Sequence, residues 1–239
     1  MNSRPAGTLP AAEVREMFNR IAPRYDRMNR IMSAGLDGRW RRAAAAAADV
    51  AAGDRVLDCC TGTGDLAVEL AHRTGPTGRV VALDFAEDML GRARPKVADL
   101  PVDLVQGDAL ALPFADDEFA AATAAFGVRN FSDLDQGLRE LARVVRPGGR
   151  VVILEITTPK RLRPLILTWF ERVVPRLGRL VGKDASAYAY LPASVRRFPD
   201  PAGLANRLRA AGLDGVEWRT YMGATIAIHC GKVSVSPRS

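Results

Sequence analysis

The sequence has few of the residues that build metal centres and disulfide frameworks. Its 239 residues include two histidines and three cysteines. Cys59 and Cys60 are adjacent and Cys230 is remote, a spacing that matches neither a zinc site nor a set of paired disulfides. We therefore expect no bound metal, and we interpret the cysteines as small reduced residues of the core.

Long apolar segments are also absent from the sequence. No stretch approaches the roughly 20 apolar residues of a membrane-spanning helix, and residues 1–7 lack the apolar run of a secretory signal. These features predict a cytoplasmic location. Aromatic residues make up 6% of the chain and no recognised nucleic-acid-binding motif occurs, so we expect no nucleic-acid partner despite the net charge of +7.

A glycine-rich loop is the most informative stretch of the chain. Residues 55–59 form a short, largely apolar run, and Gly62, Thr63 and Gly64 follow it before apolar residues recur at helical spacing. This order predicts a strand, a loop and a helix. Such a loop lets a ligand approach bare backbone at the N-terminus of a helix.

From residue 54 onward, predicted strands alternate with predicted helices, as in a parallel sheet with crossover helices. Two strands near the C-terminus, separated by Met222 and Gly223, predict a closing hairpin. The expected strands are 55–59, 79–84, 102–106, 119–126, 149–156, 216–221 and 224–229, and the expected helices are 64–74, 86–98, 133–145 and 201–211. We therefore expect a Rossmann-like α/β fold of the class I methyltransferase type, with a mostly parallel seven-stranded sheet, a terminal antiparallel β-hairpin and N-terminal helices.

The length of the chain indicates a single methyltransferase domain, 1–239. Its predicted parts are an N-terminal helical cap (1–52), a Rossmann-like core (53–157 and 201–233) and an inserted substrate- and membrane-facing segment (158–200). In the cap, residues 11–34 are predicted to be an amphipathic helix that Pro23 interrupts, and Asp37 is predicted to be the N-cap of the next helix. Residues 146–149 are predicted to be the turn before the fifth strand.

Three acids follow or end successive strands of the predicted sheet: Asp58, Asp84 and Asp108. The loop matches the dinucleotide pattern G-x-G-x-x-A, so a nicotinamide-dependent oxidoreductase is one alternative. However, Asp58 directly before the loop would repel a pyrophosphate and attract an ammonium or sulfonium group, while Asp84 can accept hydrogen bonds from a ribose. The acids favour S-adenosylmethionine as the cofactor.

Charge is distributed unevenly along the chain. Residues 53–157 carry seventeen acidic and eleven basic side chains, whereas residues 158–200 carry three acidic and nine basic ones. This contrast indicates a cationic ligand in the core and an anionic surface near the inserted segment.

Several motifs resemble the C-methyltransferases of menaquinone and ubiquinone biosynthesis. The likeness covers about residues 13–233. Its segments are Tyr25–Asn29 with Ser33 and Trp40, Phe126–Phe131, Arg143–Arg150 with Glu155–Thr157, Asp184–Leu191, Ser194, Phe198–Pro199 and His229–Lys232.

The resemblance implies that Thr63, Asp84, Asp108 and Ala109 bind S-adenosylmethionine. It also implies methyl transfer to a ring carbon of demethylmenaquinol, with a 2-methoxy-6-polyprenyl-benzoquinol of the ubiquinone pathway as the alternative acceptor. The chain departs from the family pattern at three positions. Asp37 replaces the usual His, Cys60 a Gly or Ala, and Ala125 a Ser near the cofactor.

Methylation of a quinol ring carbon requires removal of a proton from the adjacent hydroxyl, so that negative charge reaches the ring. Arg129, just beyond the fourth strand, is our candidate catalytic residue for stabilising the phenolate, with a structural ion pair as the alternative. Asn130 of the same motif, and Tyr188 and Tyr190 of the inserted segment, are candidates for binding the quinol. We interpret His229 as a core residue.

A prenylated quinol resides in a bilayer, so the enzyme must reach the membrane without crossing it. The basic flanks, namely residues 158–200 and the arginine-bearing N-terminal helix, lead us to expect a peripheral position on an anionic membrane at the inner face of the plasma membrane. A homodimer is a further hypothesis.

Overall fold

The computed structural model describes residues 10–158 and 185–235. Three helical segments precede the sheet: α1 (Ala11–Ile21), α2 (Tyr25–Met32), which follows the short 3₁₀ segment η1 (Ala22–Arg24), and α3 (Asp37–Ala47). The remaining elements are β1 (Arg55–Cys59), α4 (Asp65–Thr74), β2 (Arg79–Asp84), α5 (Glu87–Val97), β3 (Val102–Gln106), β4 (Phe119–Ala125), η2 (Val128–Asn130), α6 (Leu134–Arg143), β5 (Val145–Ile156), α9 (Ala185–Arg197), α10 (Pro201–Ala210), β6 (Leu213–Tyr221) and β7 (Ile226–Val233).

Within the described residues, seven strands form one sheet in the order β3-β2-β1-β4-β5-β7-β6. Strands β1 to β5 are parallel, and β7 pairs antiparallel with both β5 and β6. This arrangement confirms the predicted fold class and the closing hairpin. The strand order reverses between β1 and β4, and ligands of such sheets bind at the carboxyl ends of the strands beside this reversal.

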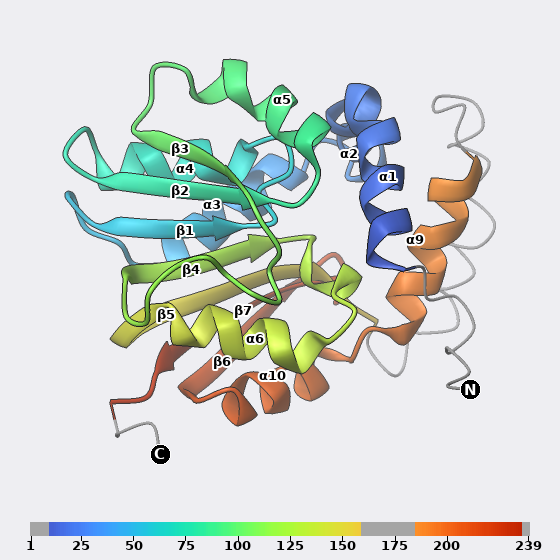
Figure 1. The fold of residues 1–239 in the computed structure, drawn as a ribbon. Coiled ribbons are helices and arrows are strands. Elements are labelled where there is room, and N and C mark those ends of the chain that lie inside the picture. The colour runs from blue at the N-terminus through green and yellow to red at the C-terminus, as the bar shows by residue number, and fades with distance from the viewer. Residues whose placement is uncertain (1–9, 159–184, 236–239) are drawn as a thin grey trace.

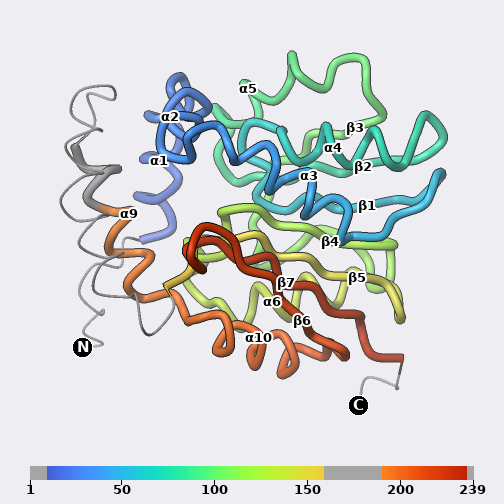
Figure 2. Tube along the Cα trace, turned by 180° about the vertical axis from the view of Figure 1, so that it is seen from behind, coloured from blue at the N-terminus to red at the C-terminus, as the bar shows by residue number. Residues whose placement is uncertain are grey.

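Helices cover both faces of the sheet (Figures 1 and 2). Helices α3 and α4 pack on one face with α5 beside them, while α6 and α10 pack on the other. This division follows from right-handed crossovers, because the chain moves outward from β1 to β3 and then in the opposite direction from β4. Helices α1, α2 and α9 lie together at the carboxyl edge of the sheet (Figure 1).

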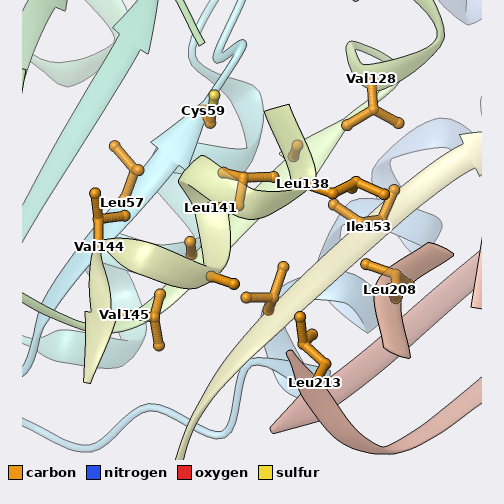
Figure 3. Close-up of a cluster of buried hydrophobic side chains, with 14 of the residues drawn as sticks. Leu57, Cys59, Val128, Leu138, Leu141, Val144, Val145, Ile153, Leu208 and Leu213 are labelled. Atoms are coloured by element: carbon orange, nitrogen blue, oxygen red, sulfur yellow. The ribbon is translucent and has the colours of Figure 1, made fainter. Parts of the chain in front are cut away.

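The larger apolar cluster lies between the sheet and helices α6 and α10. Figure 3 shows Leu138 and Leu141 of α6 among Leu57 of β1 and Ile153 of β5. All four side chains are fully buried. The apolar positions of α6 recur at helical spacing, which gives the helix one face for the sheet. Asp133 caps this helix, because its Oδ1 accepts a hydrogen bond from the backbone N–H of Gln136 at 2.9 Å.

The predicted turn at 146–149 lies inside β5 as a bulge. The pairing of β4 with β5 steps from Phe119 opposite Val145 to Ala121 opposite Arg150, so the four predicted turn residues are accommodated opposite Ala120. Gly149 is required there, because a Cβ would lie 2.5 Å from the Ala120 carbonyl oxygen. The prediction of a turn before the fifth strand was therefore wrong. Residues 146–149 are extra residues within β5, and the strand continues on both sides of them.

The N-terminal helices match the predicted segment, with one correction. Pro23 lies in η1, which separates α1 from α2 and so confirms the predicted interruption. Asp37 is the first residue of α3, and Leu36 holds the N-cap position without a side-chain cap. The carboxylate of Asp37 instead accepts hydrogen bonds from two side chains of the cap, which leaves it unavailable to the helix backbone.

No helix among the described residues is both long and apolar enough to cross a membrane.

Replacement of a buried leucine in α6 tests the position of the core. We expect Leu141→Ala to lower the free energy of unfolding by about 2–5 kcal/mol, because the change removes buried methyl groups and leaves a cavity. Chemical denaturation provides the measurement. Arg139→Ala on the exposed face of the same helix is the control, with an expected change within about 0.5 kcal/mol. Equal losses in the two variants would contradict this packing.

Candidate active site

Two left-handed turns meet at the carboxyl edge where the strand order reverses. Cys60 after β1 and Phe126 after β4 have φ angles of 57° and 60°. Gly127 packs directly on Cys60, since a Cβ at Gly127 would lie 2.3 Å from the Cys60 Cβ. Left-handed backbone is costly for residues other than glycine, and such strain concentrates at functional sites. The two turns therefore mark this edge as the candidate site.

Asp84 at the end of β2 holds the glycine loop in place. The backbone N–H of Gly62 donates to Asp84 Oδ2 at 2.8 Å, and the N–H of Ala86 donates to Oδ1 at 2.9 Å. Gly64 is left-handed with a φ of 84° and occupies the N-cap position of α4. A Cβ at Gly64 would lie 3.0 Å from the Cβ of Ala93 in α5. Glycine thus allows the loop to pack closely on α5.

A cavity of about 750 Å³, part of it open to solvent, lies at this edge. Its walls come from the ends of β1 to β4, from the following loops and from the N-terminal helices. The lining residues are Ala11, Phe18, Tyr25, Cys60, Gly62, Leu83, Asp84, Phe85, Met89, Gly107, Asp108, Ala109, Leu110, Ala125, Phe126, Gly127, Asn130, Phe131 and Ser132. The wall combines aromatic rings with a few polar groups, a combination typical of small-molecule sites.

Four of the residues predicted to bind the cofactor line this cavity: Gly62, Asp84, Asp108 and Ala109. Asp108 is exposed, and its Oδ1 accepts a hydrogen bond from the backbone N–H of Leu110 at 2.9 Å. The structure therefore brings the ends of β1, β2 and β3 together around one space, as the spacing of the acids predicted.

Asp58, Thr63 and Gly64 lie behind the cavity wall and are absent from its lining. Asp58 is 1% exposed, and its carboxylate accepts hydrogen bonds from Thr61 Oγ1 at 2.7 Å and Thr123 Oγ1 at 2.9 Å. Asp58 thus joins the glycine loop to β4. Its two hydroxyl donors place it under the loop, out of direct reach of a ligand.

Burial raises the pKa of both Asp58 and Asp84 to about 6. The hydrogen bonds that each carboxylate accepts oppose this rise, from two threonines for Asp58 and from backbone N–H groups for Asp84. The two carboxylates are close enough for the charge of Asp84 to contribute to the pKa of Asp58. A cationic ligand in the cavity would favour the ionised forms of both groups.

A cluster of polar side chains fastens the N-terminal cap to the glycine loop. Lys96 Nζ contacts Asp26 Oδ2 at 2.7 Å and Asp65 Oδ1 at 2.6 Å, and it donates to Thr63 Oγ1 at 3.2 Å. The Thr63 hydroxyl in turn donates to Asp26. Helices α2, α4 and α5 are therefore joined at one point. We call this group (Asp26, Thr63, Asp65 and Lys96) the lysine clasp.

Arg129 forms a buried ion pair beside the cavity. Its Nη1 lies 2.8 Å from Glu155 Oε1, and the same nitrogen donates to the backbone carbonyl of Phe126. Glu155 is fully buried, and burial raises its pKa, which the charge of Arg129 opposes. Arg129 does not line the cavity. Its direct contacts are those of a structural ion pair, which was the alternative to a catalytic role.

Two polar atoms near this pair have no hydrogen-bond partner, the Nε of Arg129 and the Oδ1 of Asn130. Asn130 lines the cavity, and its Oδ1 is buried. An unpaired buried polar atom is costly. A hydroxyl-bearing ligand would relieve the cost at Asn130.

Two tyrosines, Tyr188 and Tyr190, were predicted to bind the quinol. Tyr190 is buried in a cluster with Val14 and Met17 of α1 and does not line the cavity. The side chain of Tyr188 lies outside the described residues. Tyr25, by contrast, lines the cavity from α2. Burial raises its pKa, while the charges of Arg129 and Arg41 lower it.

Tyr25 was predicted to lie on the apolar face of the amphipathic N-terminal helix and in the first family-like segment, but it was not selected as a site residue. The polar ring on that face, placed before an exposed Asp26, was the available signal. His229 is buried, and its Nε2 lies 2.9 Å from the carbonyl of Pro201, in agreement with its interpretation as a core residue.

The polar groups of the cavity wall fit a nucleoside with an attached cation. They include bare backbone at Gly62, a carboxylate at Asp84, and an exposed carboxylate at Asp108. Across residues 10–158 and 185–235, no three His, Cys, Asp or Glu side chains are grouped as for a metal ion.

The sequence matches the profile of the ubiE/COQ5 methyltransferase family over residues 8–233. The chain belongs to this family. The demethylmenaquinone methyltransferase of Deinococcus radiodurans is 49% identical over 203 residues, which cover 83% of this chain and 84% of that protein. The enzyme of the same name from Thermus thermophilus is 47% identical over 219 residues, which cover 90% of this chain and 99% of that protein. These findings confirm the resemblance found in the motifs.

Solved structures support the fold. The [4+2]-cyclase SpnF aligns with a TM-score of 0.73 at 18% identity, covering 96% of this chain and 98% of that one. A SAM-dependent methyltransferase from Aquifex aeolicus aligns with a TM-score of 0.53 at 21% identity, covering 77% and 84%. At these identities the likeness shows the fold alone. Family membership disfavours the nicotinamide-dependent alternative.

The pH dependence of stability tests the buried position of Asp58. Its pKa is higher in the folded state than the ordinary value of 3.8, so the folded state binds the proton more tightly. Stability should then fall as pH rises from about 4 to about 6, by at most roughly 3 kcal/mol for this group. Asp58→Asn should reduce the fall, leaving the part due to Asp84. Urea denaturation between pH 4 and pH 8 measures it, and an unchanged profile in the variant would contradict the assignment.

Proposed function

We propose that this protein transfers a methyl group from S-adenosylmethionine to a ring carbon of demethylmenaquinol. The observation that carries the proposal is the 47% and 49% identity to two enzymes named demethylmenaquinone methyltransferase, over most of each chain. The aromatic wall of the cavity agrees with it, because Phe18, Phe126 and Phe131 suit a flat ring.

The cofactor would occupy the part of the cavity formed by the ends of β1, β2 and β3. S-adenosylmethionine, when bound, supplies an electrophilic methyl group on a sulfonium. Asp84 would accept hydrogen bonds from the ribose hydroxyls, Asp108 and Ala109 would contact the base, and the Gly62 backbone would lie along the chain of the cofactor. Asp58 and Thr63 would act behind the loop by holding its shape.

The protein must favour loss of a proton from the quinol hydroxyl next to the reacting carbon. Arg129 is our candidate for stabilising the phenolate, acting through its charge and not by direct contact. Support comes from two phenols: burial raises the pKa of both Tyr25 and Tyr190, and the charge of Arg129 opposes that rise. Asn130 Oδ1 would accept the hydrogen bond of a quinol hydroxyl, which satisfies a buried oxygen.

Incubation with labelled S-adenosylmethionine and a panel of reduced prenylated quinols tests the proposal. We expect methylated product from naphthoquinols that lack the ring methyl group, detected by mass spectrometry. Prenylated methoxybenzoquinols form the second arm of the panel. Binding of S-adenosylhomocysteine without methylation of any naphthoquinol would contradict the proposed acceptor, and methylation of benzoquinols alone would favour the ubiquinone-pathway reaction.

We also propose that the protein works at an anionic membrane surface, since a prenylated substrate resides in the bilayer. Helix α2 supports this idea. Arg27 and Arg30 are exposed on it beside Ile31, which is 41% exposed, and Arg24 precedes them. Cations around an exposed apolar side chain favour the interface of anionic lipid. The opposite side of the same helix carries Tyr25 into the cavity.

Vesicle co-sedimentation tests this surface. We expect binding to vesicles with anionic lipid, little binding to zwitterionic vesicles, and weaker binding as salt rises. Arg27→Glu/Arg30→Glu should reduce anionic binding about thirtyfold or more, at roughly 1 kcal/mol for each basic residue removed near the surface. Arg73→Glu/Arg139→Glu is the matched control of equal charge change away from α2. Equal losses in both double variants, or no preference for anionic lipid, would remove the proposal.

A further inference from the structure

Phe126, which follows β4 at the cavity, is held through its backbone N–H, its backbone carbonyl and its ring. Its backbone N–H donates to the Leu154 carbonyl at 2.8 Å, and its own carbonyl accepts a hydrogen bond from Arg129 Nη1. The φ angle of 60° places the residue in the left-handed region, which a bulky side chain rarely adopts. The surrounding contacts therefore impose this conformation, and Phe126 lines the cavity.

A second buried arginine holds the ring itself. Arg41 of α3 is 6% exposed, and its Cζ lies 5.5 Å from the centroid of the Phe126 ring. Phe126 lines the cavity, whereas Arg41 does not. A cation over an aromatic face interacts more strongly when both are removed from water.

Each of the two arginines is paired with its own acid. Arg129 pairs with Glu155, and Arg41 Nη1 lies 2.6 Å from Asp37 Oδ2. Ser33 Oγ donates to Asp37 Oδ1 at 2.9 Å, which fixes the orientation of that carboxylate. Asp37 stands where the family signature usually has histidine, so an anionic partner for Arg41 is a feature of this chain.

We propose that the Phe126 ring is the platform on which the aromatic ring of the acceptor packs, and that Asp37 and Arg41 are positioning residues for it. The inference rests on the proposed function, since it takes the acceptor to be an electron-rich quinol. A guanidinium behind the ring draws electron density away from its exposed face. That face then favours offset stacking with an electron-rich ring.

The position of Phe126 favours a role in acceptor binding, although its neighbour Ala125 stands where the resemblance places a side chain near the cofactor. Phe126 follows β4 and adjoins Gly127, within the motif that also supplies Arg129 and Asn130, whereas the predicted cofactor residues follow β1, β2 and β3. A change at Phe126 should therefore affect the acceptor more than the nucleoside.

Steady-state kinetics and binding measurements on Phe126→Leu, Phe126→Tyr and Asp37→Asn test the inference. Phe126→Leu should raise the KM for the quinol about two- to tenfold, the range expected for one aromatic pair. Phe126→Tyr should stay near wild type. Asp37→Asn should raise the same KM by a few fold. In all three, the Kd for S-adenosylhomocysteine should stay within about twofold.

The chain contains a matched control. Arg55 lies with its Cζ 5.4 Å from the Phe119 ring centroid and pairs with Glu118 at 2.9 Å, a similar set of contacts that is more exposed and lies outside the cavity. Glu118→Gln should leave the KM for the quinol unchanged. Binding of an unprenylated 1,4-naphthoquinol to the S-adenosylhomocysteine complex, measured anaerobically by calorimetry, gives a readout that does not require turnover.

The outcomes separate the two ideas. If Phe126→Leu methylates quinol with an unchanged KM, or shifts the Kd for S-adenosylhomocysteine by as much as the KM, the platform is refuted and the proposed function stands. If wild type binds the naphthoquinol in a Phe126-dependent manner without methylating any quinol, the platform stands and the proposed function fails. If Asp37→Asn and Glu118→Gln behave alike, the positioning role of Asp37 is refuted.

Discussion

The meeting of two left-handed turns at the reversal of strand order is the constraint on which the rest of the site depends. Cys60 and Gly127 touch there, so the loops after β1 and β4 cannot move apart independently. Asp58 ties the same two strands from below through Thr61 and Thr123. With both loops fixed, the ends of β2 and β3 complete the walls. The cavity is therefore a product of backbone geometry before any ligand-binding side chain is considered.

Buried charge is handled by local pairing. The two arginines that hold Phe126 each face one acid, Asp37 for Arg41 and Glu155 for Arg129. Buried pairs of this kind add little net stability against apolar residues of similar size, but removing one partner leaves an expensive isolated charge. They are better understood as devices that fix orientation. Asp58 and Asp84 have no cationic partner within hydrogen-bonding distance among the described residues, and burial raises the pKa of both.

Local patterns predicted most of the fold, because alternating apolar runs, glycine turns and caps act over a few residues. The three strand-end acids and the glycine loop were found in this way. The direction in which each side chain points was not accessible. Asp58 turns away from the cavity because two hydroxyl donors lie behind it, and Asp37 turns from the helix N-terminus because Arg41 lies one turn ahead. Thr123, one partner of Asp58, comes from a distant strand and is brought near by tertiary packing. Arg41, the partner of Asp37, competes with the helix N-terminus for the same carboxylate. Phe126 and Tyr25 were not predicted as site residues for the same reason. From sequence alone, apolar and aromatic residues are assigned to the core, and only the structure shows that these two line a cavity.

The lysine clasp has a consequence for the exchange of bound molecules. Its charged groups are partly exposed, with 30% of the Lys96 side chain and 44% of the Asp26 side chain accessible, and attraction between such groups weakens as dissolved ions screen it. The aromatic walls of the cavity have no such sensitivity. The attraction that joins the cap to the glycine loop thus weakens as ionic strength rises, whereas the packing of a ring against the walls does not depend on such attraction.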